Sequence, residues 1–252
     1  MNLDELTERL MNGGFVAADE EAAELMEAAG GDAAVLEELV VRRETGEPLA
    51  WITGNVAFCG LTILVHSDVY VPRWHTELVA ERAAARLPDG GVAIDVCTGS
   101  GAVAATLLAR RPGARVIGVD LDHNAVVNAR ANGVEAYAGD LFAPLPGDLG
   151  LADVIVGVVP YVPRRALPLL QRDTFRFETA LAYDGGEEGL DILVRVLEEA
   201  PRYLKPGGAL VLEVGGAQVG DLDADIARLP YTDVTEITDE DGDLRGIELT
   251  YG

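Results

Sequence analysis

Cysteine, histidine and lysine are scarce in this chain. Its 252 residues include two cysteines, Cys59 and Cys97, three histidines and a single lysine. The cysteines lie in unrelated segments and the histidines have no metal-ligand spacing, so we expect free, buried thiols and no metal site. No run approaches the roughly eighteen apolar residues of a membrane span, and the N-terminus is acidic rather than basic and then apolar. We therefore expect a cytoplasmic protein without a membrane segment.

Positive charge is also in short supply. The chain has 19 lysines and arginines against 43 aspartates and glutamates, which gives a formal net charge of −24. Such a surface repels phosphate backbones, so direct docking onto DNA or RNA is not expected. A cationic substrate or partner would be attracted instead. An acidic surface also keeps proteins soluble whatever they bind, and both explanations stay open.

A glycine-bearing turn follows the apolar strand expected at 92–96. The turn is Cys97-Thr98-Gly99-Ser100-Gly101, and a helix is expected from Ala102. Backbone N–H groups approach a ligand closely in such a turn at the carboxyl end of a strand. A dinucleotide site would have the pattern GxGxxG, whereas here an acid, Asp95, precedes a short Gly-x-Gly. An acid suits a phosphate-free cation, and the pattern therefore favours S-adenosylmethionine (SAM).

Two further acids follow the next expected strands, Asp120 and Asp140. A carboxylate about twenty residues after the glycine turn is where a nucleotide ribose offers its hydroxyls. An ordinary tight turn in a Rossmann-like sheet would explain the glycines but not three acids at successive strand ends. We expect the methionine moiety, the ribose and the adenine to be held by the following residues, in that order: Asp95, Thr98, Gly99 and Gly101; Asp120 and Leu121; Asp140 and Leu141, with Phe142 as a candidate cover for the adenine.

The chain divides into three regions by pattern. Residues 1–50 have helical spacing of apolar residues, with Asp32 as an expected helix cap. Residues 51–72 are rich in β-branched and aromatic residues and indicate a β-hairpin linker. Residues 73–252 alternate helices with short apolar strands, which indicates an α/β fold with crossovers. Seven strands are expected, at 92–96, 115–119, 134–138, 153–158, 209–214, 232–237 and 246–250.

Several motifs occur in a fixed order along most of the chain. They are Gly46-Glu47-Pro48-Leu49-Ala50-Trp51, Val71-Pro72-Arg73-Trp74-His75-Thr76-Glu77, Asp95-x-x-Thr98-Gly99-Ser100-Gly101, Phe177-Glu178-x-Ala180-Leu181, Lys205-Pro206-Gly207-Gly208 and Leu212-Glu213-Val214-Gly215. In this order they resemble the HemK/PrmC protein-(glutamine-N5) methyltransferases, which modify peptide-chain release factors. The resemblance runs from about residue 42 to the C-terminus. It implies a Rossmann-like seven-stranded SAM-dependent methyltransferase domain behind a small N-terminal helical recognition domain.

The sequence departs from this family at its signature, Asn-Pro-Pro-Tyr. The corresponding residues are Val158, Val159, Pro160 and Tyr161. In the family, the Asn side chain and the following carbonyl hold the amide of glutamine, whose nitrogen is a poor nucleophile and needs positioning. Valine has no hydrogen-bonding group, and such a loss commonly costs two or more powers of ten in rate. The resemblance still implies that Val159, Pro160 and Tyr161 line the acceptor pocket.

The missing asparagine leaves three functions open. A guanidino or amine compound such as arginine, held by carboxylates, needs no Asn, and Glu178 is our candidate contact. The helical region is short for the family, which also fits a small substrate. The alternatives are the family's glutamine in a release factor, and a SAM- or protein-binding module without activity. Other candidate acids are Glu77, Asp184, Glu187 and Glu188.

Three neighbouring residues have structural expectations. Arg73 is expected to pair with an acid, and Trp74 to pack rather than to stack on the adenine. His75 is expected to lie exposed in the first turn of a helix, with a place near the site as the alternative because its segment matches the family. The substrate is predicted to be small and cationic, or amide-bearing, or part of a protein. The oligomeric state is not predicted.

Overall fold

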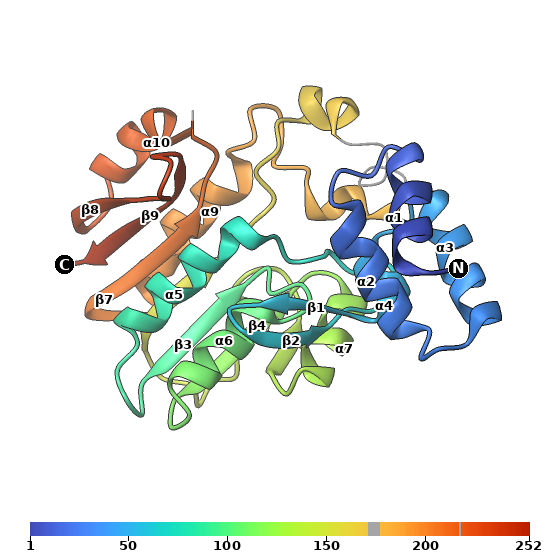
Figure 1. Cartoon of the computed structure of the whole chain (residues 1–252). Coiled ribbons are helices and arrows are strands. Elements are labelled where there is room, and N and C mark those ends of the chain that lie inside the picture. The colour runs from blue at the N-terminus through green and yellow to red at the C-terminus, as the bar shows by residue number, and fades with distance from the viewer. Residues whose placement is uncertain (171–176, 217) are drawn as a thin grey trace.

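One mixed sheet of seven strands organises the chain (Figure 1). The computed structural model describes residues 1–170, 177–216 and 218–252. The strand order is β5-β4-β3-β6-β7-β9-β8; β9 is antiparallel to both of its neighbours, and the other adjacent pairs are parallel. The strands are β3 (Val92–Val96), β4 (Arg115–Asp120), β5 (Glu135–Ala138), β6 (Ala152–Gly157), β7 (Leu204–Glu213), β8 (Tyr231–Thr238) and β9 (Leu244–Tyr251).

Helices cover both faces of this sheet, as the apolar character of its strands requires. Successive strand residues point to opposite faces, so Ala93 packs with one group of helices and Ile94 with the other. The first face is covered by α5 (Glu77–Arg86), α6 (Ala102–Arg110) and α7 (His123–Ala131), and the second by α9 (Asp191–Glu199) and α10 (Gln218–Ala227). Short 3-10 helices complete the connections: η1 (Trp74–Thr76), η2 (Arg164–Leu169), η3 (Ala180–Ala182) and η4 (Ala200–Arg202).

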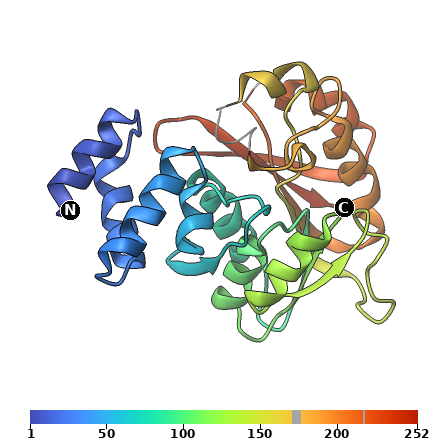
Figure 2. The same cartoon turned by 90° about the vertical axis from the view of Figure 1, so that its right-hand side faces the viewer.

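The N-terminal helices have a small core of their own. They are α1 (Leu3–Asn12), α2 (Ala18–Ala28), α3 (Ala33–Glu44) and α4 (Leu49–Thr53), and they lie to one side of the sheet (Figure 2). Asp32 accepts hydrogen bonds from the N–H groups of Ala34 and Val35, which confirms it as the cap of α3. Arg43 binds Glu21 at 2.6 Å and so ties α3 to α2. These contacts hold the helices together as a unit.

A β-hairpin connects the helices to the sheet. It consists of β1 (Asn55–Phe58) and β2 (Leu61–Leu64), and its turn, Cys59-Gly60, has positive φ at both residues, as a tight hairpin turn requires. Two asparagines, Asn128 in α7 and Asn132 directly after it, bind the backbone at the end of β2. Asn128, which is fully buried, bonds the His66 N–H and the Leu64 carbonyl, and Asn132 bonds both backbone groups of Leu64. The hairpin is thereby fixed on the domain that contains the seven-stranded sheet.

The expected fold class and strands agree closely with the structure. Two segments differ. Trp51 lies in α4, one turn of helix, because Pro48 begins a helix there before the left-handed Gly54 ends it. Helix α10 was not expected, since Gly215, Gly216 and Gly220 obscure its apolar spacing. Within the described ranges, no helix is both long and apolar enough to cross a membrane.

Candidate active site

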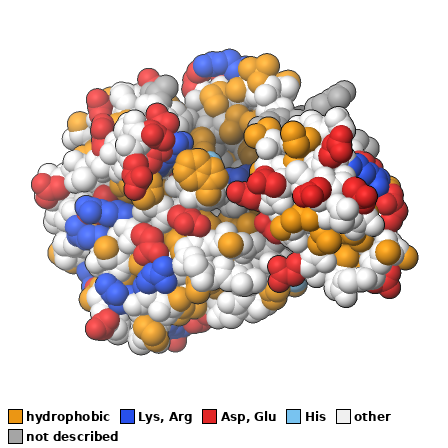
Figure 3. Space-filling model, viewed as in Figure 1, with side chains coloured by type: hydrophobic (Ala, Val, Ile, Leu, Met, Phe, Trp, Pro, Cys, Tyr) orange, Lys and Arg blue, Asp and Glu red, His pale blue; other side chains and the backbone are white. Residues whose placement is uncertain are grey.

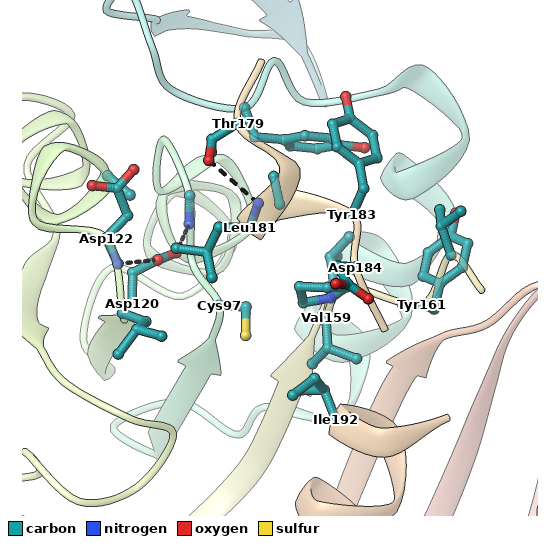
Figure 4. A pocket seen from close by; sticks show the side chains of 18 of the residues that line it. Cys97, Asp120, Asp122, Val159, Tyr161, Thr179, Leu181, Tyr183, Asp184 and Ile192 are labelled. Atoms are coloured by element: carbon teal, nitrogen blue, oxygen red, sulfur yellow. Dashed lines mark hydrogen bonds between the residues drawn. The ribbon is translucent and has the colours of Figure 1, made fainter. Parts of the chain in front are cut away.

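A cavity of about 660 Å³ opens at the carboxyl ends of β3, β4 and β6. Ligands of open α/β sheets bind at this edge, and the volume is in the usual range for cofactor and substrate sites. In Figure 4 Asp120 and Asp122 lie on one side of the cavity, Tyr161 and Tyr183 on the other, and Cys97 between them. The molecular surface is hollowed between the sheet and the N-terminal helices, with acidic side chains spread over the face in view (Figure 3). We call the side of the cavity with Asp120 and Asp122 the cofactor end, and the side with Tyr161 and Tyr183 the acceptor end.

The cofactor end is built on the glycine turn. Cys97 and Gly99 line it with φ of 58° and 55°, the left-handed conformation that lets the chain turn sharply after β3. The Gly99 N–H donates to Asp120 Oδ2 at 2.8 Å, and the Asp122 N–H donates to Oδ1 at 2.9 Å. Burial raises the pKa of Asp120, although these backbone donors counteract it. Asp120 is therefore a fixed carboxylate at the cavity wall.

Three predicted cofactor residues lie beneath the cavity rather than on its wall. Asp95 is buried, and its Oδ2 accepts hydrogen bonds from the Thr98 hydroxyl at 2.6 Å and the Ala104 N–H at 3.2 Å. Burial raises the pKa of Asp95 to about 7 despite these bonds. Gly101 has φ of 82°, and a Cβ there would meet Ala129 at 2.9 Å. These residues hold the turn in place through hydrogen bonds and close packing. Their direct contact with the cofactor stays a prediction.

The other residues predicted to contact the cofactor line the cavity, with one exception, and their contact with the cofactor stays a prediction. Leu121, Asp140 and Leu141 line the cavity. The Asp140 carboxylate is paired with Arg195 of α9, at 2.9 and 3.1 Å. The exception is Phe142, which is buried in the core and stacks on Tyr203 at 4.7 Å, so it does not cover the cavity.

The acceptor end follows β6 directly. Val158, Val159, Pro160 and Tyr161 all line the cavity, as predicted from the family resemblance. Val158 places only an apolar side chain there. Among the described residues, no hydrogen-bond donor reaches the Val159 carbonyl, which leaves that oxygen available as an acceptor.

Glu178, the candidate substrate contact, does not line this cavity; it lies on a smaller neighbouring cavity of about 230 Å³, and other residues of the chain bind its carboxylate. Its Oε1 accepts from the Val71 N–H at 2.8 Å, and its Oε2 from Arg73 Nη2 at 2.6 Å and from the Tyr183 hydroxyl. Arg73 also lies over the ring of Tyr70. Arg73 does pair with an acid as expected, and Glu178 holds the loop after β6 to the segment before α5. Of the five candidate acids, Glu178 included, only Asp184 lines the cavity, and it is paired with Arg164 at 3.1 Å.

Sequence reasoning missed the importance of Glu213, at the end of β7. This carboxylate is 1% exposed and accepts from the Thr76 hydroxyl at 2.6 Å and the Tyr161 hydroxyl at 3.1 Å. His75 Nε2 lies 3.6 Å from it and lines the cavity, rather than being simply exposed. The Leu-Glu-Val-Gly motif was the available signal. The expectation that Trp74 packs was wrong, because its side chain is 69% exposed at the cavity rim, near Arg245.

The donor set fits SAM. Asp120, the residue predicted to bind the ribose, lines one cavity of suitable size together with the left-handed Gly99 and with Asp140 and Leu141. Together with the sheet order and the antiparallel β9, they define a SAM-dependent methyltransferase.

Comparison with known proteins specifies the family. No family model matches the chain. A release factor glutamine methyltransferase of Geobacter sulfurreducens is 37% identical over 210 residues, covering 81% of this chain and 73% of that protein. One of Moorella thermoacetica is 42% identical over 74% of this chain and 68% of its own. The chain belongs to the family of release factor glutamine methyltransferases.

A solved structure supports the fold. The 16S rRNA N2 G1207 methyltransferase of T. thermophilus, in complex with AdoMet and guanosine, matches with a TM-score of 0.55. It is 19% identical, and the match covers 79% of this chain and 50% of that one. A likeness at this identity supports the shared methyltransferase fold and nothing finer.

Proposed function

We propose that this enzyme transfers the methyl group of SAM to the side-chain amide nitrogen of a glutamine in a peptide-chain release factor. The relatives that are 37% and 42% identical to it over the aligned residues are named for this reaction. A release factor as substrate also accords with the cytoplasmic location that the sequence predicts. Such a partner is a protein, so the N-terminal helices would serve to hold it.

The hydrogen bonds made by Glu178 are the observation that favours glutamine over a guanidino substrate. A guanidinium is best held by both oxygens of a carboxylate. Both oxygens of Glu178 already accept hydrogen bonds, and the positive charge beside them belongs to Arg73. A second guanidinium would meet a neutralised acid next to a cation. A neutral amide meets no such penalty, and the acceptor end therefore suits glutamine better than arginine.

The residues of the chain position the reaction rather than take part in it covalently. SAM supplies a methyl group on a positively charged sulfur. The Val159 carbonyl would accept one N–H of the amide, and Pro160 and Tyr161 would hold its plane against the cavity wall. The nitrogen lone pair then forms the bond to the methyl carbon as the carbon–sulfur bond breaks, and the nitrogen loses one proton to water.

Val158 is the observation in favour of the alternative, a small guanidino or amine substrate. It leaves the acceptor end without the family's amide side chain. The two functions differ in the acceptor that becomes methylated, so one assay separates them.

The test is a reaction of purified protein with methyl-labelled SAM and either a purified release factor or free arginine with related guanidines and amines. We expect label on one glutamine of the release factor, located by mass spectrometry, and its loss when that glutamine is replaced by alanine. Label on a small guanidine or amine instead would establish the alternative. Binding of SAM without any transfer would contradict both functions.

A further inference from the structure

A buried carboxylate lies directly behind the acceptor end. Glu213 is 1% exposed, yet among the described residues no Lys or Arg forms a salt bridge with it. Its neighbours are two hydroxyls and the edge of an imidazole: Thr76 at 2.6 Å, Tyr161 at 3.1 Å and His75 at 3.6 Å. A buried carboxylate without a salt bridge to arginine or lysine is costly, so Glu213 depends on these donors, with the charge of Arg245 acting on it from further away.

The bond to Glu213 fixes the direction of the Tyr161 hydroxyl. A phenol has one proton to donate, and here that proton points to Glu213 Oε1. The phenol oxygen keeps its lone pairs, and it can only accept a further hydrogen bond. Burial, followed by the nearby charge of Glu213, raises the pKa of Tyr161, so the hydroxyl stays protonated at neutral pH. Tyr161 and Val158 line the same cavity, where the family's asparagine would supply an acceptor oxygen.

We infer that the Tyr161 hydroxyl oxygen accepts an N–H of the substrate amide and thereby replaces the acceptor that Val158 lacks. Glu213 is then a positioning residue, because it takes the hydroxyl proton and leaves the oxygen free for the substrate. With the Val159 carbonyl, two acceptors face the two N–H groups of a primary amide. This inference rests on the proposed function, since it takes the substrate to be glutamine.

A double-mutant cycle between positions 161 and 158 tests the inference with the full chain, SAM and a release factor. Tyr161→Phe should lower kcat/KM about tenfold, as expected for one lost hydrogen bond, with SAM affinity unchanged. Val158→Asn should raise kcat/KM and restore an acceptor. In the Val158→Asn background, Tyr161→Phe should then cost no more than about twofold. A structural role for Tyr161 would cost the same in both backgrounds, and that additive result would overturn the inference.

Two further variants sharpen the cycle. As a single change, Glu213→Gln should lower kcat/KM. In the Tyr161→Phe background it should cause no further loss, because its effect passes through the Tyr161 hydroxyl. Full, independent losses from the two changes would also contradict the inference. Tyr231→Phe is the matched control: it removes a partly buried hydroxyl that donates to the Leu197 carbonyl, far along the sheet, and should leave kcat/KM unchanged. If the unmodified enzyme labels no release factor, the proposed function fails first, which is a different result.

Discussion

The two ends of the cavity are assembled in different ways. The cofactor end comes from one short stretch of β3, its turn and the ends of β4 and β5, and its key hydrogen bond joins Gly99 to Asp120, 21 residues apart. The acceptor end joins segments more than a hundred residues apart, such as Arg73 with Glu178 and Thr76 with Glu213. Local geometry constrains the first end, and tertiary packing creates the second. This difference explains why sequence motifs identified the cofactor but not the methyl acceptor.

The largest expected effect is on SAM affinity, and it comes from a change at Asp120 in the cofactor end. Asp120→Ala removes the carboxylate that would bind the ribose and the partner of the Gly99 N–H. We expect SAM affinity to fall by at least about 100-fold, since two hydrogen bonds to a charged group are lost. Isothermal titration calorimetry measures it, with Asp233→Asn on exposed β8 as the control. Unchanged affinity would show that Asp120 does not hold the cofactor.

The buried Asp95 makes the cofactor end sensitive to pH. Its pKa in the folded protein is about 7, above the ordinary value of 3.8, so folding favours the protonated form. Its contribution to stability is complete below about pH 4 and is lost as pH rises through 7. Relative to Asp95→Asn, the unmodified protein should therefore lose a few kcal/mol of stability between about pH 4 and 8. Urea unfolding across this range measures it, and parallel curves for the two proteins would contradict the prediction.

Two glycines of the same turn should respond differently. Gly101→Ala combines a left-handed φ with a contact of 2.9 Å to Ala129, and we expect it to cost about 3 kcal/mol of unfolding free energy. Gly99→Ala meets no atom within 4 Å and should cost about 1 kcal/mol, but its methyl group would project from the cavity lining and weaken SAM binding. Thermal unfolding and SAM titration compare the two. Equal stability of both variants would be evidence against the role we assign to Gly101.

The last of these effects concerns the acceptor end. Arg73→Met leaves Glu178 buried with one charged partner fewer. Because Arg73 is about a third exposed, we expect a loss of only about 2 kcal/mol of stability. Turnover should fall while SAM affinity stays the same, as measured by kinetics beside calorimetry. A parallel loss of SAM affinity would mean that the two ends are not independent.

The fold could be predicted almost completely, because its strands are short apolar runs and its turns contain glycine. Asp120, Leu121, Asp140 and Leu141 were located correctly on the cavity, since each lies at the end of a strand or within three residues after it. Glu178 was placed near the site, but its engagement by Val71, Arg73 and Tyr183 depends on contacts that no local pattern records. Glu213 was missed for the same reason.

The most direct test of the account is the effect of Val158→Asn on methylation of a release factor. We attribute the unusual acceptor end to a weakened grip on the same substrate. The substitution should therefore raise kcat/KM for release-factor glutamine and leave SAM affinity unchanged. Two results would show that the acceptor end has been rebuilt for another substrate. One is loss of release-factor methylation in Val158→Asn, and the other is transfer by the unmodified enzyme to free arginine but not to the release factor.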